Sequence, residues 1–104
     1  MNLSLKPIKN NRIVWHEHDG EVVLLVKNRG IFNRVLQLLK TKPETSYIHL
    51  DEIGSYVWKI IDGEKTVFEI GKELENKFSR KAFPVYERLT YFLGTLRESK
   101  LIIF

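Results

Sequence analysis

The chain has 104 residues, of which 43% are hydrophobic and 29% charged, and it contains no cysteine. This length and composition predict a single soluble globular domain, residues 1–104. The lack of cysteine excludes disulfides and thiolate chemistry, and it agrees with a cytoplasmic location. No segment approaches the roughly 20 apolar residues of a membrane span, and no signal peptide is expected. The net charge of +4 is scattered along the chain, which favours a solvated basic surface.

The first predicted element is a β-hairpin over residues 12–27. Asp19-Gly20 is a dipeptide suited to positive φ at both central turn positions. It separates residues 12–17 from residues 22–27, two runs rich in β-branched and aromatic side chains. Residues 22–26 are apolar at every position, so we expect cover on both faces of this strand.

An inserted segment, residues 28–44, precedes a third predicted strand. Its "IFNRVLQLLK" run, residues 31–40, has the apolar spacing of a helix, and Pro43 ends that helix. We expect this helix to cover the sheet or to pack against a second chain in a homodimer. The "TSYIHL" run, residues 45–50, then returns to an extended pattern.

Three amphipathic helices are predicted in the remaining chain. Asp51 is a candidate N-cap for the first, and Gly63 is expected to end it as a left-handed residue. Thr66 and Glu69 form a capping-box pair for the second helix, and Pro84 fits the first turn of the third. The expected core positions are Ile53, Val57, Ile60 and Ile61, then Val67, Ile70, Leu74 and Phe78, and finally Val85, Leu89, Phe92 and Leu96. About three antiparallel strands with these helices predict a winged-helix-like α+β domain.

No catalytic or metal site is predicted. His16 and His18 would share one face of a strand, but only His49 remains as a further histidine, so solvated side chains are the simpler interpretation. The serines occur in no nucleophile motif, and Gly54 and Gly71 favour close helix packing over phosphate binding. We therefore expect no enzymatic activity, no metal and no cofactor.

The two-helix stretch "LDEIGSYVWKIIDGEKTVFEIGKELENKF", residues 50–78, followed by "YERLTYFLGTLRESKLI", resembles the PqqD family. The resemblance includes Leu50, the Val57-Trp58 pair, the Asp62-Gly63 turn and the run of residues 66–70. It implies a small winged-helix-like peptide chaperone, or precursor-peptide recognition element. Such proteins bind the leader of a ribosomally made peptide and present it to a modifying enzyme, often a radical-SAM enzyme.

The resemblance and the chain order together suggest where a peptide would bind. A leader peptide can add a strand to an open sheet edge through main-chain hydrogen bonds. We expect this edge on the third strand, at Tyr47, Ile48 and His49, and we expect Ile48→Pro to remove a donor from it. One flank of the third helix would form the other wall, with these residues: Tyr86, Thr90, Leu93 and Arg97.

The alternative is a winged-helix DNA-binding regulator. In that interpretation Lys77, Arg80 and Lys81 would contact phosphates beside a helix-turn-helix. The turn between the second and third helices is longer than the usual three or four residues, and the third helix starts with the apolar "FPVYERL" run. Peptide binding is therefore the preferred hypothesis, and we do not expect nucleic acid as a partner.

Overall fold

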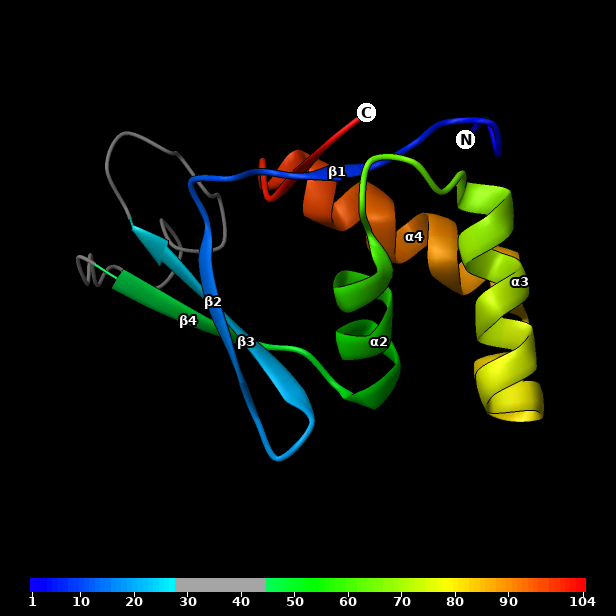
Figure 1. Ribbon diagram of the computed structural model, residues 1–104, viewed down its shortest axis with the longest axis horizontal. Helices are drawn as coiled ribbons and strands as arrows, with labels where there is room; N and C mark the ends of the chain where they lie inside the picture. Colours follow the sequence, from blue (N-terminus) through cyan, green and yellow to red (C-terminus); the bar gives the residue numbers. More distant parts are fainter. Residues whose placement is uncertain (28–44) are drawn as a thin grey trace.

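The computed structural model describes residues 1–27 and 45–104, arranged as a small sheet beside a group of helices (Figure 1). The three-stranded sheet has the order β2-β3-β4, with β2 at Val14–His18, β3 at Glu21–Lys27 and β4 at Thr45–His49. Both strand pairs are antiparallel. The predicted hairpin is confirmed, with φ values of 51° at Asp19 and 82° at Gly20. The helix predicted at residues 31–40 lies outside the described residues.

Three α-helices follow the sheet as predicted: α2 at Glu52–Ile60, α3 at Val67–Phe78 and α4 at Val85–Glu98. A short 3-10 helix, η1, at Ser79–Ala82 joins α3 to α4. The Asp51 carboxylate caps α2 by accepting a bond from the Gly54 N–H at 2.7 Å. The predicted capping box is present at the start of α3. Local side-chain signals therefore fix where α2 and α3 begin.

The end of α2 differs from the prediction. The helix stops at Ile60, and the next residue, Ile61, is already extended, with φ −65° and ψ 118°. Gly63 does have a positive φ of 81°, but it lies in the turn beyond the cap. The Asp62 carboxylate accepts bonds from the backbone N–H groups of Glu64 and Lys65, each at 2.9 Å. This side-chain turn competes with the helix, which ends one residue earlier than it would with Gly63 directly after the C-cap.

The core lies between β3 and the helices. On β3, Val22 and Leu24 are fully buried, and Val23 on the opposite face is only 5% exposed, in agreement with the expected cover on both faces. Trp58 on α2 is also fully buried, and the ring of Trp15 on β2, which is 37% exposed, meets it edge-on with centroids 6.2 Å apart. Trp58 is therefore a core residue.

The core stripe of α4 is shifted from the expected one. Val85, Leu89 and Leu96 are buried as predicted, but Leu93 is fully buried whereas Phe92 is only partly buried. Sequence spacing could not distinguish these neighbours, because both lie within the apolar arc of the helix. The core of α4 is thus rotated towards Leu93.

The two chain ends form a second, two-stranded sheet that the sequence did not predict. Strand β1, Ile8–Lys9, pairs antiparallel with β5, Ile102–Ile103. Before β1, the N-terminal segment runs along the start of α3 (Figure 1), and the carbonyls of Leu3 and Leu5 accept bonds from Phe68 and Val67. These bonds satisfy two of the backbone donors that every helix start leaves free. The N-terminal segment therefore belongs to the folded domain.

Candidate functional site

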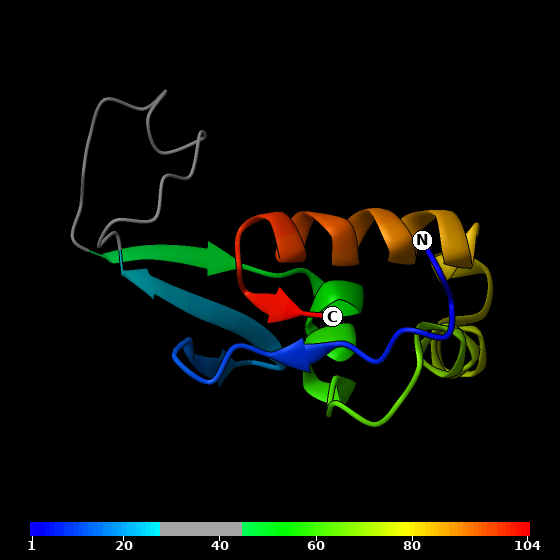
Figure 2. The same cartoon turned by 90° about the horizontal axis from the view of Figure 1, so that it is seen from above.

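Strand β4 has one open edge. Within the described residues it pairs with β3 on one side and with no strand on the other. Figure 2 shows β4 and α4 on the same side of the molecule, with β2 on the opposite side of the sheet. An open edge presents unpaired backbone donors and acceptors to any extended chain that reaches it.

The strand register identifies the backbone groups that face this edge. The Leu50 N–H donates to the Val22 carbonyl at 2.9 Å, so Val22 and Leu50 face each other across the bonded side of the ladder. Bonded and non-bonded pairs alternate in antiparallel sheets. Ile48 therefore turns its N–H and C=O towards Leu24 on β3, whereas Tyr47 and His49 turn theirs outwards. The expectation that Ile48→Pro tests the edge was wrong, because the Ile48 N–H belongs to the internal ladder.

The side chains of β4 alternate between the two faces of the sheet. Tyr47 is 61% exposed, and His49 is exposed on the same face of the sheet. Ile48 packs partly buried against the core on the other face. A chain added at this edge would thus meet an apolar side chain on the helix side and polar aromatic side chains on the outer side.

A buried hydroxyl fixes the end of β4. Ser55 on α2 is fully buried, and its Oγ accepts a bond from the Val22 N–H at 2.7 Å. The same hydroxyl donates to the Leu50 carbonyl at 3.2 Å. Ser55 therefore bridges β3 and β4 where their ladder ends and ties both strands to α2. Sequence reasoning missed this residue, because a lone serine inside a helix has no distinguishing pattern.

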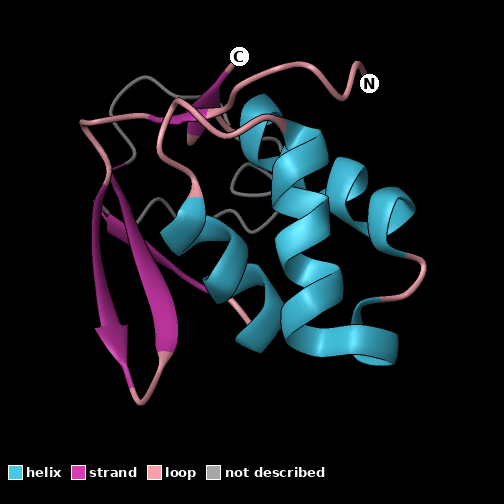
Figure 3. Cartoon of the chain, turned by 45° about the vertical axis from the view of Figure 1, so that its right-hand side comes forward, coloured by secondary structure: helices cyan, strands magenta, loops and turns pink. Residues whose placement is uncertain are grey.

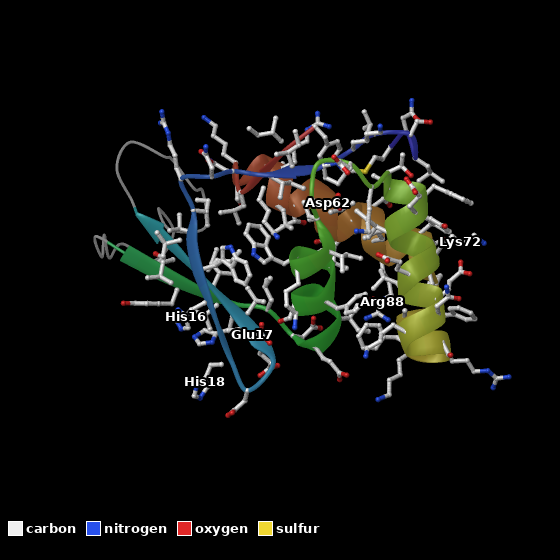
Figure 4. All side chains as sticks on the ribbon, viewed as in Figure 1. His16, Glu17, His18, Asp62, Lys72 and Arg88 are labelled. Carbon is white, nitrogen blue, oxygen red and sulfur yellow. The ribbon has the colours of Figure 1, made fainter. Side chains whose placement is uncertain are left out.

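Arg88 and Phe92 of α4 face the start of α2, which follows β4 in the chain. A Cβ atom on Gly54 would lie 3.3 Å from the Phe92 ring, so α2 and α4 approach closely there. The predicted role of Gly54 in close packing is therefore confirmed. Arg88 and Phe92 also line a cavity of about 90 Å³ together with Asp51, Ile53, Gly54, Val57, Leu74, Ala82, Val85 and Leu89. The Arg88 guanidinium donates to the Lys81 carbonyl at 2.6 Å, and Figure 4 shows Arg88 in the region between α2 and α3.

The α4 residues predicted for the site lie elsewhere. Leu93 is fully buried, so its predicted role as a surface anchor is wrong. The Tyr86 hydroxyl donates to the Phe68 carbonyl at 3.0 Å, and the two rings stack at 6.1 Å against α3. Thr90 bonds to the Tyr86 carbonyl within its own helix, and Arg97 lies 5.2 Å from the ring of Phe104. An α-helix rotates by about 100° per residue, so α4 has two opposite flanks. One flank holds Tyr86, Thr90 and Arg97, and the other holds Arg88, Phe92 and Thr95.

Titratable groups with displaced pKa values lie away from the open edge. Backbone N–H bonds from Lys65 and Glu64 hold the pKa of Asp62, in the turn after α2 (Figure 4), well below its usual range. Burial lowers the pKa of Lys9, which lies beside Trp15 and Trp58. His16 and His18 are exposed on β2. The described part of the chain holds no group of three or more His, Asp or Glu residues placed to bind a metal ion.

The fold and this open edge define a winged-helix-like α+β domain with a strand available for pairing. A family model described as coenzyme PQQ synthesis protein D (PqqD) matches residues 21–102. The chain therefore belongs to the PqqD family, and the resemblance noted in the sequence is confirmed.

One solved structure is similar to this chain over nearly the whole length of both. It is TbiB1 in complex with the TbiA(beta) leader peptide, with 26% sequence identity and a TM-score of 0.66. The match covers 91% of this chain and 93% of that chain. No curated protein sequence matches the chain. Neither the family nor this structure favours the DNA-binding alternative.

No helix in residues 1–27 and 45–104 is long and apolar enough to cross a membrane.

Proposed function

We propose that this protein is a non-catalytic peptide chaperone that binds the leader of a ribosomally synthesised precursor peptide. The leader adds a strand to β4 and is presented to a modifying enzyme, a radical-SAM enzyme or another class, in the cytoplasm. The open edge of β4, with outward backbone groups at Tyr47 and His49, is the observation that carries this proposal. Membership of the PqqD family and the similar structure with a bound leader peptide support it.

The contact surface we propose differs from the one expected from the sequence. Tyr47 and His49 supply the main-chain groups, and Ile48 supplies an apolar contact on the helix side. On α4, we propose Arg88, Phe92 and Thr95 as the facing wall. Main-chain pairing provides affinity with little dependence on sequence, and the α4 wall then selects among leaders.

Backbone methylation of the leader tests strand addition directly. The cognate leader, identified from a precursor-peptide gene beside this one, is synthesised with a single N-methyl group at each successive residue. Because alternate residues of an added strand bond to β4, we expect affinity to fall at every second position. Each lost main-chain bond contributes about 1 kcal/mol, or about a fivefold change in Kd. Titration calorimetry measures the series, and a loss without this period of two would contradict strand addition.

Proline substitution on the protein supplies the complementary test. Tyr47→Pro removes an outward donor from β4. The matched control is Glu17→Pro on β2, whose N–H also faces an open edge, since His18 and Glu21 are the bonded pair next to the two-residue turn. We expect Tyr47→Pro to weaken leader binding at least about fivefold, with Glu17→Pro close to the wild type. Circular dichroism checks that both variants fold, and equal loss in both would place the site elsewhere.

Two arginines distinguish the two flanks of α4. Arg88 lies on the flank of α4 that faces Asp51 and Gly54 at the start of α2, whereas Arg97 lies on the other flank beside Phe104. We expect Arg88→Ala to weaken leader binding and Arg97→Ala to leave it unchanged. The reverse pattern would restore the flank expected from the sequence.

A further inference from the structure

A second hollow lies on the other side of α2 from the proposed leader site. It is an open cleft of about 610 Å³ between the β2–β3 turn, α2 and the end of α3. Figure 3 shows the hairpin projecting beside these two helices. The cleft is lined by Asp19, Gly20, Glu21, Glu52, Tyr56, Lys59, Ile60, Lys77 and Phe78.

Helix geometry keeps the cleft separate from the leader site. Gly54 faces Phe92 of α4, whereas Tyr56 lines the cleft. Two residues along an α-helix rotate the side chain by about 200°, so these positions lie on opposite sides of α2. Both surfaces can therefore be occupied at the same time.

The floor of the cleft is apolar and ordered by ring contacts. The rings of Tyr56 and Phe78 meet edge-on, with centroids 5.4 Å apart. Phe78 is 9% exposed, and Tyr56 and Ile60 are partly buried. The Lys77 ammonium lies 5.9 Å from the Tyr56 ring. A preformed aromatic floor of this kind suits an apolar side chain of a partner protein.

The rim carries excess negative charge in a protein whose net charge is +4. Asp19, Glu21 and Glu52 contribute three carboxylates, against the two ammonium groups of Lys59 and Lys77. Lys59 is already paired with Glu17 at 3.2 Å. The charges left to face a partner are therefore mainly carboxylates, which select a cationic segment and repel an acidic one.

We propose that this cleft docks a basic segment with an apolar side chain from the enzyme that modifies the bound peptide. This inference rests on the proposed function. The apolar side chain packs on Tyr56 and Phe78, and neighbouring lysine or arginine side chains meet Glu21 and Glu52. Leader and enzyme would then occupy opposite sides of α2, so that the enzyme binds without displacing the strand added to β4.

Amide-shift mapping of the full chain tests the cleft. The probes are acetyl-Phe-Lys-Arg-amide and its charge-reversed counterpart acetyl-Phe-Glu-Glu-amide. We expect the basic probe to shift amides of the β2–β3 turn, the outer face of α2 and the end of α3. The variant Glu21→Lys/Glu52→Gln should weaken this binding at least about fivefold, since it removes two rim carboxylates and adds a cation. The matched control Glu64→Gln/Glu98→Lys makes the same change in net charge outside the cleft and should bind like the wild type.

The outcomes separate this inference from the proposed function. The inference is supported if only the basic probe shifts the cleft amides, and if these shifts are lost in the cleft variant but kept in the control. Equal shifts with both probes, equal loss in both variants, or no cleft shifts at millimolar probe overturn it. Leader titration of the cleft variant is the independent measurement, and wild-type affinity is expected there. A chain that fails to bind leader while the cleft responds as described would overturn the proposed function alone.

Discussion

Removal of one buried hydroxyl tests how the end of β4 is held. In Ser55→Ala, the Val22 N–H loses its acceptor at 2.7 Å and the Leu50 carbonyl loses its donor at 3.2 Å. Each buried group left without a partner costs about 1–3 kcal/mol. Because the 2.7 Å bond is the stronger of the two, we expect a total loss of about 2–4 kcal/mol in the free energy of unfolding. For a domain of this size, that loss lowers Tm by about 10 °C or more.

Chemical denaturation of Ser55→Ala measures this loss, with Thr95→Ala as the control. Thr95 is exposed, and its hydroxyl donates to the Tyr91 carbonyl of its own helix, so its loss should cost less than about 0.5 kcal/mol. Hydrogen exchange adds a local readout, since the Val22 amide should lose protection in Ser55→Ala. A loss below about 0.5 kcal/mol for Ser55→Ala would refute the reasoning. It would mean that Val22 and Leu50 pair directly once the hydroxyl is gone.

Three further predictions concern the helices. Leu93→Ala should lower the free energy of unfolding, measured by denaturation, by about 2–5 kcal/mol, because truncation of a fully buried leucine leaves a cavity. Unchanged stability together with weaker leader binding would contradict this and indicate that Leu93 is a surface residue. Gly71→Ala should cost about 1–3 kcal/mol, because its Cβ would lie 2.6 Å from Cζ of the Tyr86 ring, and Tyr86→Ala should relieve most of that cost. Bonds from the Thr66 backbone N–H and hydroxyl lower the pKa of Glu69 from 4.5. The ionised Glu69 carboxylate therefore stabilises the fold above pH 4.5, and this contribution is lost as pH falls through the pKa of the folded state. Glu69→Gln should make the free energy of unfolding less dependent on pH in that range, as measured by denaturation at several pH values.

Much of the fold was predictable because its signals are local. The Asp19-Gly20 turn, the Asp51 cap and the Thr66–Glu69 capping box each depend on a few neighbouring residues, and all three are present. The predicted close packing at Gly71 is also confirmed by its approach to Tyr86. By contrast, the pairing of β1 with β5 joins residues more than 90 positions apart, and no local pattern reports such a contact.

The surroundings of the α4 side chains could not be predicted from the sequence for a related reason. The sequence gives the spacing of apolar residues along α4 but not the direction from which α2 and α3 approach it. Tyr86 and Phe92 both flank the apolar stripe, yet the first meets α3 and the second meets Gly54 of α2. Which flank is left near β4 depends on how the helices cross, and that is set by packing across the whole core.

The sequence also did not reveal which backbone groups of β4 face the open edge. The third strand was located correctly from the sequence. Which of its residues turn their N–H and C=O groups towards β3 depends, however, on how the two strands pair. The bond from Leu50 to Val22 sets that pairing, and a shift of one residue would exchange the roles of Ile48 and its neighbours. Ser55 supports this register by bridging Val22 and Leu50 at the end of the ladder. Under the proposed function, a slip in this register would offer the leader peptide a different set of backbone donors and acceptors.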